Sequence, residues 1–198
     1  MAATTHWLAS SCAMAVLERD GNAFDAAVAA GFVLHVVEPN LNGIAGEMVA
    51  IVATASDPRP RVLAGTGSAP AAATIEQFRS LGLPAVPGGG LLPAAVPGQF
   101  DAWMLLLRDH GTWQLGDVLS FAITYAQRGI LVGPKLHDTI RSVQRIFEQH
   151  WPTSHAKWMP GGQVPPVGAL LTNTAYAETL ERLTRSGDRL PSREQRID

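Results

Sequence analysis

The sequence predicts an α+β fold that is mostly helical and carries one small sheet. Several segments repeat apolar residues at the three- and four-residue spacing of an amphipathic helix. Two short runs rich in β-branched residues, 47–54 (EMVAIVAT) and 61–65 (RVLAG), have the length of strands. The turn-forming residues DPRP lie between them, so these runs predict a hairpin and with it the sheet.

Two helices are predicted near the N-terminus. Thr5 can cap the first helix, and Gly21 is placed as the residue that terminates it. Asn22 follows as the next N-cap, and Asp25 approximates a capping box and brings negative charge to the positive end of the helix dipole. This second helix runs to about Val37. Its alanines leave almost no polar face, so we expect a central helix that neighbouring elements approach closely.

The rest of the chain is predicted to be helices joined by loops rich in glycine and proline. Apolar spacing predicts further helices at 74–81, from Pro97 through Leu107, and at 116–128, 135–150 and 173–186. Three consecutive glycines at 88–90 indicate a flexible loop, and a linker rich in proline and glycine is expected at 160–168.

The composition indicates a chain whose surface is more apolar than usual. The 198 residues suit one domain, and 46% of them are hydrophobic whereas only 16% are charged. Average proteins carry about 25% charged residues. Part of this surface must therefore be covered by something apolar, either a partner surface or a remainder of the chain.

Charge and hydropathy argue against nucleic acids and membranes as partners. The formal net charge is −2 and the basic residues are scattered, so there is no basic stripe. The N-terminus lacks the pattern of a signal peptide, and no stretch reaches the roughly 18 uninterrupted apolar residues of a membrane span. We expect a soluble protein, cytoplasmic or periplasmic, that binds neither nucleic acid nor a membrane.

The stretch AGTGSAPAAA at 64–73 has the glycines of a phosphate-binding loop but not its chemistry. The lysine of such a loop is missing, and Pro70 removes an amide donor. No GxSxG elbow is present for a serine nucleophile. The six histidines show neither HExxH nor another tight ligand spacing, so neither a metal site nor a cofactor is expected.

Single histidine and cysteine residues are interpreted as structural. His35 sits inside an apolar helix, which favours a satisfied core histidine, and His150 and His155 are expected on a surface loop. Cys12, the only cysteine, lies on the inner stripe of the first helix. A cysteine in that position is more often packing than a nucleophile. Residue chemistry alone therefore identifies no catalytic residue in this chain.

A series of motifs runs in one order along almost the whole chain. The opening ATTHWLASSCAMAVLERDGNAFDAAVAAGFVLHVVEPNLNGIAGE is followed by Ser-Ala-Pro-Ala-Ala at 68–72, Val-Pro-Gly at 96–98 and His-Gly-Thr-Trp at 110–113. The block GNAFDAAVA at 21–29 is the most specific of these. In this order the motifs resemble the N-terminal region of γ-glutamyltranspeptidases.

The resemblance implies an N-terminal-nucleophile hydrolase with a four-layer αββα fold. Such a protein is made as one precursor and cuts itself before a threonine or serine, whose side chain becomes the nucleophile. That residue begins the small subunit and lies beyond this sequence. Residues 1–198 are expected to form a single incomplete domain, the N-terminal part of the large subunit. Its expected partners are the remainder of the large subunit and the small subunit.

The resemblance places substrate-binding residues at Thr66, Gly67 and Ser68. In γ-glutamyl enzymes the matching turn reads Arg-Glu-x-Ala-Pro, and its arginine holds the α-carboxylate of the glutamyl group. Here Thr66 and Gly67 stand at the arginine and glutamate positions. A neutral hydroxyl cannot replace a guanidinium fork. We therefore expect an acylase or amidohydrolase whose small-molecule amide substrate has shifted from γ-glutamyl compounds, for example toward acyl-cephalosporins.

Two other hypotheses stay open. A true γ-glutamyl hydrolase or transpeptidase could take its basic residue from another part of the protein. The chain could also be a non-catalytic truncated fragment or an assembly module. This last hypothesis predicts exposed apolar surface on the helix at 22–37 and on the strand at 47–54.

Overall fold

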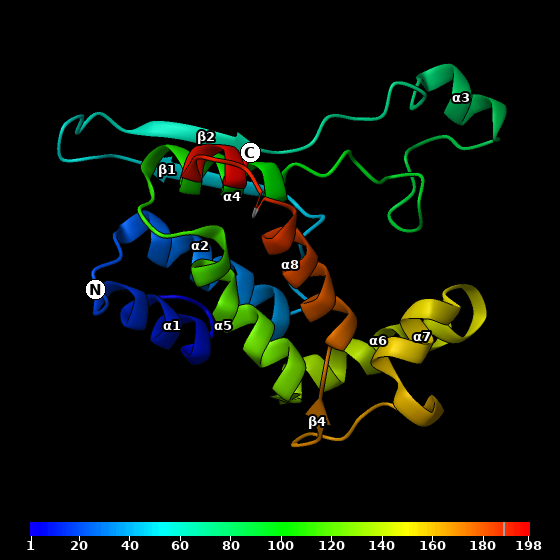
Figure 1. Cartoon of the computed structure of the whole chain (residues 1–198). Coiled ribbons are helices and arrows are strands. Elements are labelled where there is room, and N and C mark those ends of the chain that lie inside the picture. Colours follow the sequence, from blue (N-terminus) through cyan, green and yellow to red (C-terminus); the bar gives the residue numbers. More distant parts are fainter. Residues whose placement is uncertain (188) are drawn as a thin grey trace. The chain divides into compact units, whose positions relative to one another are not determined.

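In the computed structural model, which describes residues 1–187 and 189–198, the chain divides into two compact units (Figure 1). The first unit combines Met1–Gly43 with Leu106–Asp198, and the second is Ile44–Leu105. Helices dominate the described residues, as predicted. The small strands form two antiparallel pairs, β1 with β2 and β3 with β4, where the sequence predicted one sheet.

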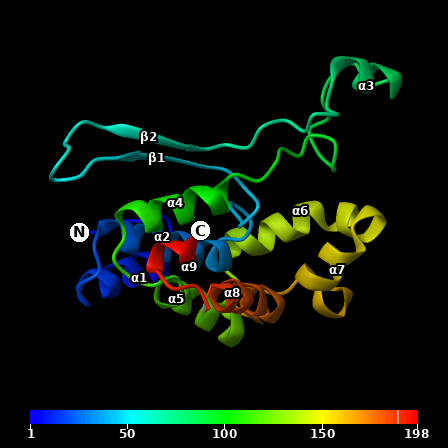
Figure 2. The same cartoon turned by 45° about the horizontal axis from the view of Figure 1, so that its top comes forward.

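The first unit is built from helices. They are α1 (Trp7–Leu17), α2 (Ala23–Val37), the end of α4 (Gln99–His110), α5 (Leu115–Arg128), α6 (Pro134–His150), α7 (Pro152–Trp158), α8 (Thr174–Ser186) and α9 (Arg193–Ile197). Contacts join α1 to α2, α2 to α5 and α5 to α8, so these four helices form one packed group (Figure 2). No helix in the described part of the chain is both long and apolar enough to cross a membrane.

Helix α2 lies at the centre of this group. Val28, Phe32 and Val33 have no exposed surface, and only Ala23 and Ala27 of the helix are exposed. The predicted close approach of neighbouring elements is thus confirmed. The fragment hypothesis predicted exposed apolar surface on this helix. That prediction is wrong, because α1 and α5 already cover the helix.

The start of α1 differs by one residue from the prediction. His6, and not Thr5, is the N-cap, and its Nδ1 accepts a hydrogen bond from the Leu8 amide at 3.2 Å. The Thr5 hydroxyl instead donates to the carboxylate of Glu38. A histidine ring nitrogen thus serves as the cap, where a hydroxyl or carboxylate oxygen is usual.

The end of α1 also differs from the prediction. The helix ends at Leu17, and Asp20 adopts the left-handed conformation with φ of 63°. The Gly21 amide, one residue later, donates to the Val16 carbonyl at 3.0 Å. Aspartate tolerates this conformation because its side chain is short and polar. Gly21 is required for another reason, since a Cβ there would lie 2.4 Å from a methyl carbon of Val16.

The second unit begins with the predicted hairpin. Strand β1 (Met48–Val52) pairs antiparallel with β2 (Arg61–Gly65), and the register places Ile51 opposite Val62. In the connecting turn, Asp57 forms ion pairs with Arg59 and Arg61 at 3.0 and 2.6 Å. Both ion pairs are solvent-exposed on the arginine side and contribute little to stability. The short helix predicted at 74–81 is confirmed as α3 (Ile75–Ser80), and Thr74 is its N-cap.

One face of the hairpin carries exposed apolar side chains. Val49, Ile51 and Val62 are 62%, 76% and 68% exposed. In β1, Val49 and Ile51 alternate with less exposed residues, as the pleat requires. The predicted exposed apolar surface of the strand at 47–54 is therefore confirmed. Such a face is typical of a surface that another element covers.

The C-terminal part of the first unit holds elements that the sequence did not reveal. His150 is the last residue of α6 and His155 lies in α7, so their prediction as a surface loop is wrong. Pro152 starts α7 because its fixed φ suits the first turn of a helix. Strands β3 (Ile130–Leu131) and β4 (Leu170–Leu171) are two residues each, too short for a periodic pattern.

Candidate functional site

The three candidate substrate-binding residues lie directly after β2, in the second unit. Thr66 and Ser68 are exposed, and Gly67 is half-buried. The side chains of Thr66 and Ser68 make no hydrogen bond within the residues that the structure describes. Beyond them, the Ala73 amide donates to the Pro70 carbonyl at 2.8 Å and closes a turn. The two hydroxyls are therefore available to a ligand.

The segment 96–98 holds this turn by close backbone contact. The Val96 amide donates to the Ser68 carbonyl at 2.9 Å. A Cβ on Gly67 would lie 1.5 Å from the Val96 carbonyl oxygen, and a Cβ on Gly98 would lie 2.7 Å from the Gly65 carbonyl oxygen. No side chain fits at Gly67 in this arrangement, because real Cβ contacts stay beyond about 3 Å.

This contact was not predicted from the sequence. The motifs at 68–72 and 96–98 were recognised separately, and only the fold brings them together. The sequence signal for this contact is the set of glycines at Gly65, Gly67 and Gly98, since glycine marks places where two backbones approach closely. The glutamate that γ-glutamyl enzymes carry at the position of Gly67 is thus incompatible with the backbone path seen here.

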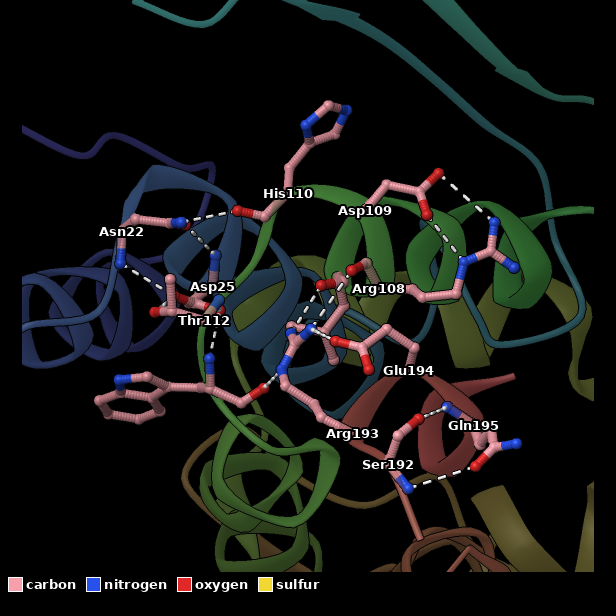
Figure 3. A network of polar contacts seen from close by, with 12 residues as sticks. Asn22, Asp25, Arg108, Asp109, His110, Thr112, Ser192, Arg193, Glu194 and Gln195 are labelled. Atoms are coloured by element: carbon pink, nitrogen blue, oxygen red, sulfur yellow. Dashed lines mark hydrogen bonds and ion pairs between the residues drawn. The ribbon is translucent and has the colours of Figure 1, made fainter. Parts of the chain in front are cut away.

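A second cluster of polar contacts lies in the first unit, around Asp25 (Figure 3). Asp25 has no exposed surface. Its carboxylate accepts hydrogen bonds from the amides of Asn22, Thr112 and Trp113 at 2.9, 2.8 and 3.0 Å, and from the Thr112 hydroxyl at 2.7 Å. The predicted capping box is confirmed, with Asn22 accepting from the Asp25 amide. The loop at 112–113 adds three donors that no local pattern predicted.

These contacts decide the charge of Asp25 and its role. Burial by itself would raise the pKa of this carboxyl, but the hydrogen bonds from Trp113, Asn22 and Thr112 outweigh burial and leave the pKa below its usual value. Asp25 is therefore ionised at neutral pH. Four donors occupy its oxygens, so it has no lone pair left for a substrate proton. Asp25 joins α2 to the 112–113 loop and is not a general base.

Arg193 holds the same loop from the other side (Figure 3). Its guanidinium donates to the carbonyls of Trp113, Arg108 and Leu107 at 2.9, 3.2 and 2.7 Å. The carbonyls of Leu107 and Arg108 belong to the last turn of α4, and the Leu107 carbonyl also accepts from the Gly111 amide at 2.9 Å. Arg193 thus satisfies a helix end with a residue more than 80 positions away. No local pattern around Arg193 indicates this contact.

His35 is a core histidine, as predicted. It is 5% exposed, and its Nδ1 lies 2.9 Å from the Tyr176 hydroxyl. Burial lowers the pKa of His35 to about 4, because desolvation disfavours the imidazolium form. Burial also raises the pKa of the Tyr176 hydroxyl. Both groups are neutral at physiological pH, so this pair forms part of the packing between α2 and α8.

Cys12 is also a packing residue. It is 2% exposed, and burial raises the pKa of its thiol to about 12. A thiol with such a pKa is neither a nucleophile nor readily oxidised at neutral pH. No three histidine, cysteine, aspartate or glutamate side chains within residues 1–187 and 189–198 lie close enough to hold a metal ion.

The state of Cys12 gives a direct prediction. In the native protein at pH 8, a disulfide reagent such as 5,5′-dithiobis(2-nitrobenzoate) is expected to react with Cys12 at least about 100-fold more slowly than in urea, because burial blocks both access and ionisation. The measurement is the rate of thionitrobenzoate release, with Cys12→Ser as the blank. Reaction at equal rates in both conditions would contradict the buried position.

The sequence matches the family described as Gamma-glutamyltranspeptidase over residues 9–191. The Glutathione hydrolase-like YwrD proenzyme of Bacillus subtilis (strain 168) is 30% identical over 190 residues, and the Acylase ACY 1 proenzyme of Pseudomonas sp. (strain V22) is 33% identical over 196 residues. Each alignment covers 94% of this chain and 35% of the relative. The chain therefore spans about a third of the length of these relatives.

The fold is likewise similar to that of solved structures. The structure of LmbA2991T421A is 53% identical, with a TM-score of 0.94, and the match covers 98% of this chain and 33% of that one. The predicted fold class, that of a portion of an N-terminal-nucleophile hydrolase, is confirmed. Because the family match extends over most of the chain, this chain belongs to the gamma-glutamyltranspeptidase family.

Proposed function

We propose that this chain is the N-terminal part of the large subunit of an amide-hydrolysing enzyme. In the complete protein, a threonine or serine at the start of a small subunit attacks the amide carbonyl and forms an acyl-enzyme, which water or an amine then cleaves. The large subunit contributes to the binding of the acyl group. Residues 1–198 form one incomplete domain of this assembly, and its partners are the remainder of the large subunit and the small subunit.

We further propose that its preferred acyl group is not γ-glutamyl. The observation that carries this proposal is the turn at Thr66 and Gly67, where γ-glutamyl enzymes have Arg-Glu. The close approach of Val96 to Gly67 supports it, since it leaves no room for the glutamate side chain. A substrate bound here would meet two neutral hydroxyls, from Thr66 and Ser68. This favours acyl groups without a carboxylate at this end, because neutral hydroxyls do not supply the charge-assisted contact that a carboxylate takes from arginine. A cephalosporin with an uncharged acyl group is such a substrate.

A gain-of-function variant tests the proposal. In the complete protein, Thr66→Arg is expected to raise kcat/KM for γ-glutamyl-p-nitroanilide by about 10- to 100-fold, since a charge-assisted contact contributes roughly 1.5–3 kcal/mol. The same change is expected to lower or leave unchanged kcat/KM for a cephalosporin with an uncharged acyl group, such as phenylacetyl, because the added arginine finds no carboxylate there. The measurement is steady-state hydrolysis of both substrates by wild-type and variant protein.

The matched control is Thr153→Arg. Thr153 is exposed in α7 and belongs to the first unit, so an arginine there adds the same charge to the protein without changing the turn itself. It is expected to leave both kcat/KM values unchanged within about twofold. Rapid hydrolysis of γ-glutamyl-p-nitroanilide by the wild-type protein would overturn the shifted specificity and favour a true γ-glutamyl hydrolase. No hydrolysis of either substrate by the self-cleaved protein would overturn the proposed substrates.

A further inference from the structure

A surface groove in the first unit shares no residue with the turn at 66–68, and we name it the α5 groove. Its volume is about 350 Å³, and it is lined by Arg19, Ser120, Phe121, Thr124, Tyr125 and Arg128. All of these residues except Arg19 belong to α5. The proposed amide hydrolysis uses none of them, although Arg19 lies within the opening segment that resembles the family.

The α5 groove follows one side of a helix whose other side is buried. The buried residues of α5 include Val118, Leu119 and Ala122, and the helix packs on α2 and α8. The groove residues recur on neighbouring turns of α5, from Ser120 to Arg128. Eight residues of helix span about 12 Å, so the groove has room for a small molecule lying along the helix.

Two guanidinium groups reach the α5 groove without an acidic partner. No carboxylate among the described residues lies within ion-pair distance of Arg19 or Arg128. The Arg19 guanidinium carbon lies 5.9 Å from the centre of the Phe121 ring. Arg128 ends α5, and Arg19 follows the end of α1, where a cation complements the helix dipole. That role accounts for the two positions and leaves the N–H donors of both groups available to an anion.

The hydroxyl groups of the α5 groove add a second recognition element. The Ser120 hydroxyl donates to the Asp117 carbonyl at 2.7 Å, and the Thr124 hydroxyl donates to the Ser120 carbonyl at 2.8 Å. Because both protons are engaged within the helix, these two oxygens act toward a ligand as acceptors. Tyr125 is half-buried, and its hydroxyl forms no hydrogen bond within the described part of the chain. The groove thus offers cationic donors beside neutral acceptors and an aromatic surface.

We propose that the α5 groove binds a small organic carboxylate that also carries an N–H group, of the class of N-acylated amino acids. The guanidinium groups of Arg19 and Arg128 bind the carboxylate through charge-assisted hydrogen bonds. The oxygens of Ser120 and Thr124 accept the amide N–H, and the Phe121 ring contacts the apolar side chain of the ligand. A simple anion uses only the first of these contacts, so the groove selects the amide-bearing acid.

The binding test places a reporter in the groove itself. Fluorine-labelled phenylalanine is incorporated at position 121 of the complete protein, and its ¹⁹F NMR signal is followed as N-acetyl-L-phenylalanine is added. A saturable shift with a Kd on the order of 1 mM is expected for a ligand of this size. N-acetyl-L-phenylalaninamide lacks the charge, 3-phenylpropanoate lacks the N–H, and inorganic phosphate lacks both the N–H and the ring. Each is expected to bind at least about fivefold more weakly.

Variants identify the groups responsible. The double variant Arg19→Gln with Arg128→Gln is expected to weaken binding at least about 10-fold. Arg145→Gln, an exposed arginine of α6 without an ion pair among the described residues, serves as the matched control and is expected to bind like wild type. If the double variant does not fold, the single variant Arg128→Gln takes its place, with binding about threefold weaker than wild type because one of the two charge-assisted contacts is lost.

Three results would overturn the proposal. They are a ¹⁹F signal that does not move, equal binding of the acid and its amide, and phosphate binding as tight as that of N-acetyl-L-phenylalanine. Hydrolysis of the amide substrates is expected to be unchanged in the double variant. If the proposed amide hydrolysis fails, the binding test of the α5 groove is unaffected. If binding to the groove fails, the proposed amide hydrolysis is unaffected.

Discussion

Asp25→Asn is expected to lower the free energy of unfolding by about 3 kcal/mol. The side-chain NH2 group of the new asparagine would face N–H and O–H groups that donate to the carboxylate of Asp25, and two donors cannot bond to each other. The carboxylate of Asp25 accepts from three backbone amides and one hydroxyl, and it has no exposed surface. The Thr112 hydroxyl can rotate so that its oxygen accepts a hydrogen bond from the new NH2 group, but the backbone amide of Asn22 can only donate. The measurement is urea unfolding at pH 7, followed by circular dichroism.

The same variant has a characteristic pH dependence. The pKa of Asp25 is lower in the folded protein, so its ionised form stabilises the fold at pH values above the ordinary carboxyl pKa of about 4. This contribution is lost as the pH falls below that value toward the folded pKa. The difference in stability between wild type and Asp25→Asn is therefore expected to be largest near pH 7 and to shrink below pH 4. A constant difference would contradict the assigned ionisation.

Asp117→Asn is the matched control for Asp25. Asp117 is exposed in the first turn of α5, so its charge interacts favourably with the helix dipole alone. The expected loss is a few tenths to about 1 kcal/mol. A loss at Asp117 as large as that at Asp25 would show that charge in general, and not the buried contacts, stabilises the protein.

Gly67→Ala is expected to lower the free energy of unfolding by at least about 3 kcal/mol, at the upper end of what overpacking costs. The added Cβ would lie 1.5 Å from the Val96 carbonyl oxygen and 2.6 Å from the Val96 carbonyl carbon. Neither atom belongs to a flexible side chain, so the backbone of one segment must move. The measurements are urea unfolding and the rate of limited proteolysis within 66–98.

Gly88→Ala is the control for Gly67. A Cβ at Gly88 meets nothing within 4 Å, and Gly88 does not have a positive φ. The change is expected to be neutral, or to stabilise the protein by up to about 1 kcal/mol through the unfolded state. Equal stability of the two variants would mean that the segments at 67 and 96 are not held together.

Local rules predicted the helices well where the signal lies within a few residues. Asn22 and Asp25 contact each other's backbone across a single turn, and this capping box is confirmed. The hairpin follows from two β-branched runs and the turn between them. By contrast, β3 and β4 are each two residues long, and they pair across about 40 positions of sequence. Nothing in their local sequence distinguishes them from a loop.

The candidate site divides in the same way. The departure from the γ-glutamyl pattern at Thr66 and Gly67 is a property of the residues themselves and was visible in the sequence. The lack of space for a side chain at Gly67 was not visible in the sequence, because Val96 is distant in the sequence and approaches Gly67 only in the folded protein. The roles of those residues in substrate binding remain a prediction.

The sequence by itself determined most of the helices and the β1–β2 hairpin, and it contained the motifs of the gamma-glutamyltranspeptidase family. These properties depend on side chains that act on their own backbone or repeat with one period. Only the tertiary structure decided that Asp25 binds the loop at Thr112, 87 positions away, and that Arg193 binds the end of α4, 86 positions away. Such contacts form because buried polar groups must find partners after the chain has collapsed, and a local pattern does not specify which partner they find.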